Sequence, residues 1–188
     1  MTGWKQRKAL ARWEDDTRLW AHETAKDLVM AMVTGQPTLA SPYGIGVVLE
    51  AGERVWAECP VRFLQERPMA PPAGHSSIPS IRPWLVTSER IVGRLGDHRL
   101  YGWRWGQIIG SRVDLSPGAE HVALDLDDCA RLDWIGPGIA PLAVAAVNRL
   151  HGPEALIDHP GLEVLRVGEP QPISWRIDAG PCQGWARL

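Results

Sequence analysis

Between Arg82 and Leu126, apolar residues come in short runs that are separated by residues typical of tight turns. Trp84–Val86 is a run of residues that favour strands, and Arg90–Leu95 resumes the same pattern. Gly96–His98 then predicts a turn, because Gly tolerates positive φ and Asp can bond to its own backbone. The stretch therefore predicts a meander of antiparallel strands, around which the rest of the chain is organised.

The meander continues with three more predicted strands. Leu100–Trp105 places Tyr101, Trp103 and Trp105 on one face, because side chains alternate along a strand. Ile108–Leu115 follows, with Gly110 as a candidate bulge. His121–Leu126 alternates apolar and polar residues, which predicts a half-exposed strand, and Arg131–Ile135 predicts a last one.

Two segments show helical periodicity. Residues 4–33 predict one long amphipathic helix, which we expect to dock on the sheet or on a second copy of itself. Its stripe at spacings of three and four comprises Leu10, Trp13, Thr17, Trp20, Thr24, Leu28 and Ala31. Pro141–His151 predicts a second helix, and its apolar residues surround it so nearly completely that we expect it to be buried.

The remaining segments divide the chain into parts. The helical residues 1–35 are followed by a linker at 36–44, a domain at 45–151 and a C-terminal extension at 152–188. Within the domain, 68–80 predicts a mobile loop, which is either functional or disordered. Smaller elements are predicted as follows: a short strand, or the entry to one, at Ile45–Leu49, an edge or bulged strand at Glu53–Leu64 because of Pro60, a helical turn at Glu154–Asp158 and a strand at Leu162–Val167.

The order of these motifs resembles the PH-like superfold, and within it the GRAM and bacterial PH domains. The matching residues are Gly52–Val55, Trp84–Val92 and Trp105–Ile109, with Pro141–His151 as the closing helix. The resemblance implies an α+β fold, in which an antiparallel meander forms a partly open barrel capped by a C-terminal helix. Residues 136–162 also look like uncharacterised actinobacterial proteins, a likeness that carries no function.

Composition narrows the function classes. A chain of 188 residues suits one domain with extensions, and its net charge of -2 argues against a nucleic-acid partner. The longest apolar run is shorter than the roughly 20 residues that a membrane span needs, so we expect no transmembrane segment. Three widely spaced Cys residues and the lack of a signal core predict a cytoplasmic protein, and the excess of Arg over Lys hints at a bacterial source.

Ten Trp residues stand beside only two Tyr and one Phe. They either fill core positions or form a contact surface, because Trp is enriched at interfaces. On the N-terminal helix, Trp13, Trp20 and Leu28 are the candidate partner-binding residues. Ahead of them, Lys5–Arg12 is basic beside Trp4, which fits either a solvated helix end or an anchor at a membrane surface.

Cations gather on the predicted central strands. Arg90, Arg94, His98, Arg99 and Arg104 are candidate ligand-binding residues, because a lipid headgroup site needs converging positive charge. The alternative is that these Arg residues solubilise exposed strands, since Glu89 and Asp97 dilute the charge.

We find no sequence motif for catalysis, a cofactor or a metal. Asp125–Asp128 lacks the Gly and distant Glu of a calcium loop, and His151 and His159 stand at no zinc spacing. Cys59 and Cys129 have no neighbouring base in the sequence, so we expect inert thiols.

Three functions remain open. The first is a non-enzymatic, protein-binding domain that associates with a protein partner or with itself through the N-terminal helix. The second is a peripheral membrane module that binds anionic lipid headgroups. The third is an enzyme of unrecognised type, which a deep polar pocket with a perturbed His or Asp would favour.

Overall fold

The computed structural model describes residues 3–35, 46–65, 81–94 and 99–166. Seven strands lie in one sheet, and they are β1 (Val55–Gln65), β2 (Arg82–Thr87), β3 (Arg90–Arg94), β4 (Leu100–Arg104), β5 (Ile108–Asp114), β6 (His121–Leu126) and β7 (Arg131–Ile135). The helices are α1 (Gly3–Thr34), α2 (Ala140–His151) and α3 (Ala155–Asp158), with short 3-10 turns η1 (Trp105–Gln107) and η2 (Pro160–Leu165).

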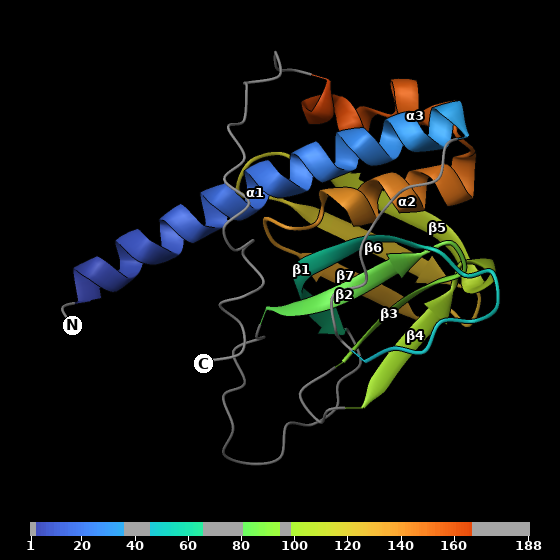
Figure 1. Ribbon diagram of the computed structural model, residues 1–188, viewed down its shortest axis with the longest axis horizontal. Coiled ribbons are helices and arrows are strands. Elements are labelled where there is room, and N and C mark those ends of the chain that lie inside the picture. Colours follow the sequence, from blue (N-terminus) through green and yellow to red (C-terminus); the bar gives the residue numbers. More distant parts are fainter. Residues whose placement is uncertain (1–2, 36–45, 66–80, 95–98, 167–188) are drawn as a thin grey trace.

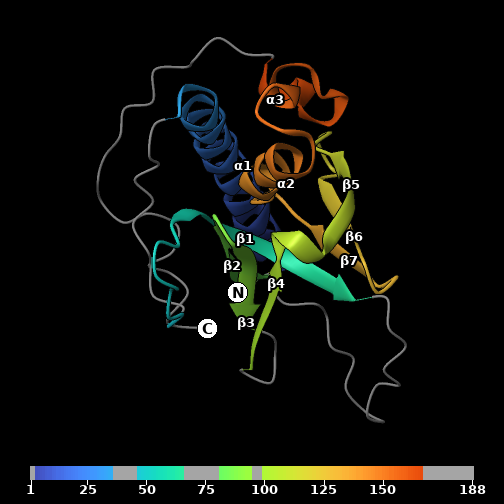
Figure 2. The same ribbon diagram turned by 90° about the vertical axis from the view of Figure 1, so that its right-hand side faces the viewer.

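The sheet is an antiparallel meander that bends around α2 without closing. Its order is β4-β3-β2-β1-β7-β6-β5, so β4 and β5 are the two edge strands. They do not pair with each other, although η1 connects them in the chain. The strands β2–β4 lie on one side of β1 and β5–β7 on the other, and β1 pairs with both β2 and β7 (Figure 2). This architecture confirms the predicted α+β fold class, an antiparallel meander that stays open and is capped by a C-terminal helix.

Pro60 predicted an edge strand or a bulged strand. The edge position is wrong, because β1 is the central strand, whereas its register does shift between Val55 and Ala57. Its first part pairs with β2, and from Arg62 onward it pairs with β7. Pro60 lies opposite Pro83, and two prolines cannot exchange the hydrogen bonds of a bonded pair. They therefore occupy a non-bonded pair beside the point where β1 changes partner, and the sheet tolerates both.

Aromatic rings fill the middle of the bent sheet. Phe63 lies 5.2 Å from Trp84 and 5.1 Å from Trp134 between ring centroids, and Trp103 stacks at 5.8 Å on Trp84. The side chains of Trp84 and Trp134 are completely buried. Contacts at these separations are favourable beyond the burial of apolar area alone. The core interpretation of the abundant Trp residues therefore holds for this cluster.

Helix α2 closes the open side of the sheet, and α1 lies across α2 (Figure 1). Residues 140–147 of α2 are all buried, as the apolar pattern predicted. Small side chains on both helices, Ala21 and Ala25 of α1 among them, are fully buried where the helices approach. Docking of α1 on the sheet or on a second copy of itself was expected, and within the chain the structure places α1 mainly on α2.

Two smaller elements differ from expectation. The described residues 46–50 form no strand, so of the two alternatives for Ile45–Leu49 only the entry to a strand remains, and Pro160–Leu165 is a 3-10 turn where a strand was expected. Gly161 lies so close to the Val113 carbonyl that a Cβ would stand 2.4 Å from it, which explains the turn's tight contact with β5. The predicted bulge at Gly110 is confirmed by a register shift between Ile108 and Gly110. The linker 36–44, the loop 68–80, His98 and most of the C-terminal extension lie outside the described residues.

Candidate interaction sites

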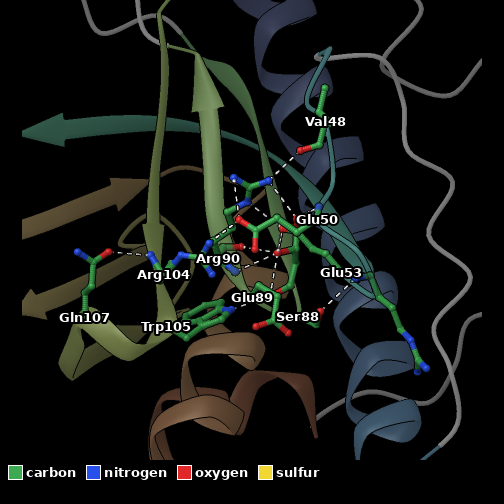
Figure 3. Close-up of polar contacts among 11 residues, drawn as sticks. Val48, Glu50, Glu53, Ser88, Glu89, Arg90, Arg104, Trp105 and Gln107 are labelled. Carbon is green, nitrogen blue, oxygen red and sulfur yellow. Dashed lines mark hydrogen bonds and ion pairs between the residues drawn. The ribbon is translucent and has the colours of Figure 1, made fainter.

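A buried ion pair organises the corner where β2 turns into β3. Arg90 donates from Nε to Glu53 Oε1 at 2.9 Å and from a terminal nitrogen to Glu53 Oε2 at 3.0 Å. The Glu53 side chain is 0% exposed and that of Arg90 is 18% exposed. Thr87 donates to Glu53 Oε1 at 2.6 Å, and its hydroxyl accepts from the backbone N–H of Arg90 at 3.0 Å (Figure 3). The turn sequence thus builds a bidentate, charge-assisted pair.

The same pair fixes the irregular segment that precedes β1. Arg90 also donates to the Val48 carbonyl at 2.9 Å, and the Glu50 N–H donates to Glu53 Oε2 at 2.7 Å (Figure 3). Burial alone would raise the pKa of Glu53. The hydrogen bonds from Arg90, Glu50 and Thr87 outweigh it, so the pKa of Glu53 is lowered. Glu53 therefore stays ionised, as the partner of Arg90.

The second cation at this corner is also neutralised. Arg104 stands directly opposite Arg90 in the sheet and forms a close ion pair with Glu50. Glu50 also lies 3.9 Å from Arg90. Two acids therefore balance two cations, and repulsion between Arg90 and Arg104 is relieved.

The structure unites only some of the predicted ligand-binding residues. Arg90 and Arg104 meet, whereas Arg94 extends to the Gly46 carbonyl at 3.5 Å, further along the strand. Arg99 is exposed and takes part in an interaction of its own. Sequence reasoning missed Glu50 and Glu53 as the partners of these cations. Glu53 stands within the motif Gly52–Val55, but a motif does not disclose which cation an acid will meet.

The predicted partner-binding stripe of α1 faces the protein itself. Leu28 is 1% exposed, and the half-buried Trp20 packs against the hydrophobic core. Trp13 is also half-buried and has an interaction of its own. Leu28 is therefore a core residue of this chain, because the stripe that was expected to meet a partner covers α2.

A second apolar line runs along the opposite side of α1. Leu19, Met30 and Val33 are 52%, 61% and 45% exposed. Between them, Lys26 donates to Glu23 at 2.8 Å. The spacing of these residues also repeats at helical intervals, and sequence reasoning missed it because the longer Trp stripe dominates the pattern. We call Leu19, Glu23, Lys26, Met30 and Val33 the outer seam of α1.

The start of α1 extends beyond the body of the protein (Figure 1). Residues 4–12 are all exposed, and Lys8 lies over the Trp4 ring at 5.5 Å from its centroid. Leu10 continues the docked stripe, but at 50% exposure nothing among the described residues covers it.

A cavity of about 300 Å³ lies where α1 passes the turn between β5 and β6. Arg18 and Glu120 form a close ion pair in its wall, and Glu14 and Arg62 are its other charged residues. Burial lowers the pKa of Arg18, but its bonds to Glu120 and Asp15 outweigh this, and the pKa is raised. Neither His nor Asp, the residues that would favour an enzyme interpretation, is among the residues that line this cavity.

The remaining polar clusters serve local structure. Asp133, which is 7% exposed, has Oδ1 at 2.6 Å from His121 Nε2 and accepts from Arg131 at 3.2 Å. His159 Nδ1 accepts from the Gly161 N–H at 3.1 Å. Within the described ranges, no group of three or more His, Cys, Asp or Glu side chains is arranged to hold a metal ion. No described helix combines the length and the apolar character that a membrane crossing requires.

Comparison with known proteins assigns no family to this chain. No family model matches the sequence, and no curated protein matches it. Among solved structures, one similar chain is a Vps36 N-terminal PH domain. It is 10% identical, with a TM-score of 0.39, over 58% of this chain and 86% of that domain. Such a score implies no residue-by-residue correspondence, and the architecture rests on the strand order and the capping helix.

Proposed function

We propose that this chain is a non-catalytic, PH-like interaction module that binds protein through the outer seam of α1. The proposal includes the closer kinship to GRAM and bacterial PH domains and a place in the cytoplasm. The observation that carries it is the exposure of Leu19, Met30 and Val33 on a helix whose opposite face is already buried. Single apolar residues on a surface are ordinary, whereas an aligned set marks a contact surface.

The charges of the molecule also favour a protein partner over an anionic lipid. Arg90 and Arg104, the two cations that come together, are paired with Glu53 and Glu50. A headgroup would have to displace these carboxylates, one of which is fully buried. The net charge of -2 provides no general attraction to an anionic membrane.

Affinity capture from extracts of the native cells tests the proposal. The wild-type chain is compared with a Leu19→Glu/Met30→Glu variant, which places charges on the outer seam. The matched control is Ile109→Glu, because Ile109 is 69% exposed and lies on β5. We expect the wild type and the control to retain the same specific protein, and the double variant to lose it. Equal retention by all three chains would overturn the proposal.

Vesicle sedimentation separates the lipid alternative. Vesicles that contain phosphatidylserine are mixed with the chain at low salt, where electrostatic binding is strongest. We expect the chain to stay in the supernatant. If it pelleted with vesicles, and Arg104→Gln abolished that pelleting, the predicted headgroup site would be the function instead.

A further inference from the structure

We propose that the partner of the outer seam is a second copy of this chain, which binds in the antiparallel direction with its Met30 against Leu19. This inference rests on the proposed function, since it names the partner of the same surface. It depends on the order of residues along the seam.

The seam has the spacing of a two-helix contact. Its positions 19, 23, 26, 30 and 33 alternate steps of four and three residues. This alternation keeps one face of a helix along a partner helix, as in a coiled coil. The buried face of α1, with Thr17, Ala21, Ala25 and Leu28, lies on the other side of the helix. A second helix can therefore lie on the seam without displacing α2.

The seam is complementary to itself only when its direction is reversed. Read forward from Leu19 to Met30, it is apolar, acidic, basic and apolar. In an antiparallel pair, Leu19 meets Met30 of the second copy and Glu23 meets Lys26, and each contact occurs twice. Such a symmetric pair uses the same patch on both chains. One position further out, Val33 meets Asp16, and there the apolar contact ends.

The parallel direction is unfavourable for the same residues. It would place Glu23 against Glu23 and Lys26 against Lys26, and like charges facing each other at an interface are destabilising. The existing bond from Lys26 to Glu23 within each helix, at 2.8 Å, orders both side chains before association. Four charges then alternate in sign across the antiparallel pair.

Sedimentation velocity on the full chain, from about 1 µM to about 1 mM, tests this arrangement over the range of weak to moderate affinities. We expect a dimer with a dissociation constant on the order of 10 µM, as for a small transient interface. Glu23→Lys or Lys26→Glu alone places like charges opposite each other and should weaken the dimer by at least about tenfold. The combined variant restores opposite charges and should return to within about threefold of the wild type.

Controls separate association from folding. Circular dichroism shows whether each variant keeps its helix, because the single changes also break a bond within α1. Ile109→Glu should dimerise as the wild type does. A chain that stays monomeric throughout, or a combined variant that stays monomeric while folded, would overturn the second copy as partner. The capture experiment distinguishes the two proposals. If the wild type retains a protein other than this chain, and Leu19→Glu/Met30→Glu loses that protein, the proposed function survives and only the second copy as partner is overturned.

Discussion

Glu53 and Arg90 occupy the corner of the sheet where a ligand site was expected, and their geometry is that of a structural pair. Both oxygens of the Glu53 carboxylate accept hydrogen bonds from Arg90, and its side chain is fully buried. A buried charge is tolerated only when it is paired and its hydrogen bonds are complete. The residues that looked available in the sequence are therefore committed to holding β3 to the segment before β1.

Replacing Glu53 by Gln should destabilise the fold by about 2 kcal/mol, because it removes the bidentate partner of the largely buried Arg90 and leaves only the Glu50 carboxylate, 3.9 Å away. Urea unfolding at neutral pH measures the loss. Glu50→Gln is the matched control, since the Glu50 side chain is 43% exposed and should contribute less than about 1 kcal/mol. Equal losses in the two variants would contradict the structural role of Glu53.

The same pair gives a pH dependence of known sign. The folded pKa of Glu53 is lowered, so its stabilising effect is complete above the ordinary glutamate pKa of about 4.3 and is lost as the pH falls through the folded value. We therefore expect the stability gap between wild type and Glu53→Gln to narrow below about pH 4. Urea midpoints of both proteins across this range measure the gap, and a constant gap would show that the carboxylate charge is not responsible.

Cys129 holds a backbone conformation that suits glycine, with φ at 65° in the turn between β6 and β7. A residue with a Cβ is strained there by roughly 1 kcal/mol. Glycine relieves this strain, but it also increases the conformational entropy of the unfolded chain, which cancels part of the gain. Cys129→Gly should therefore raise stability by about 0.5 kcal/mol, and the branched Cys129→Val should lower it by about 1 kcal/mol. Unfolding midpoints under reducing conditions test the order, which would be reversed if the turn relaxed freely.

At the scale of elements, the aromatic cluster depends on a glycine that faces it. A Cβ on Gly93 of β3 would stand 2.5 Å from the Trp84 ring, and Trp84 is fully buried among other rings. Glycine lets the ring lie flat against the neighbouring strand.

Gly93→Ala should therefore cost about 2 kcal/mol, because the crowded core must shift to admit one methyl group. Thermal unfolding measures the cost, and near-ultraviolet dichroism should show altered packing of the Trp rings. Gly106→Ala is the control, since nothing lies within 4 Å of its Cβ position and the change should stay within about 0.5 kcal/mol. Similar effects at both positions would show that Trp84 moves aside without cost.

The elements that the sequence predicted well are those whose period is carried by many residues. The central strands and α2 were placed within a residue or two, because apolar alternation and an all-round apolar helix are strong local signals. Pro60 misled the prediction for β1. The central strand accommodates Pro60 because the residue opposite it, on another strand, is Pro83. Gly161 ruled out the strand at 162–167 through its approach to Val113. Both failures involve contacts between distant segments, which no local pattern contains.

The candidate site was less predictable for the same reason. Convergence of the predicted cations was one of two alternatives, and Arg90 and Arg104 do stand opposite each other in the sheet. The acids that neutralise them, Glu53 and Glu50, lie much earlier in the chain, 37 residues before Arg90 and 54 residues before Arg104 respectively. On α1 the periodicity identified one stripe as a surface, but a helix with two apolar lines does not disclose which line meets the protein's own core. The line that is buried is the one that fits α2, whose small side chains allow Ala21 and Ala25 to approach closely.

At the scale of the whole molecule, α1 belongs to the folded body only from about Trp13 onward, and this division predicts the effect of truncation. Among the residues removed by a 1–12 truncation, residues 4–12 are exposed, so the truncation should change the unfolding free energy by less than about 1 kcal/mol. Removing residues 1–35 uncovers α2 and the contacts of Ala21, Ala25 and Leu28, which should cost at least about 3 kcal/mol. Urea unfolding followed by far-ultraviolet dichroism and Trp fluorescence measures both. If the chain without residues 1–35 unfolded at the wild-type midpoint, α1 would be an appendage, and its inner stripe would again be free for a partner.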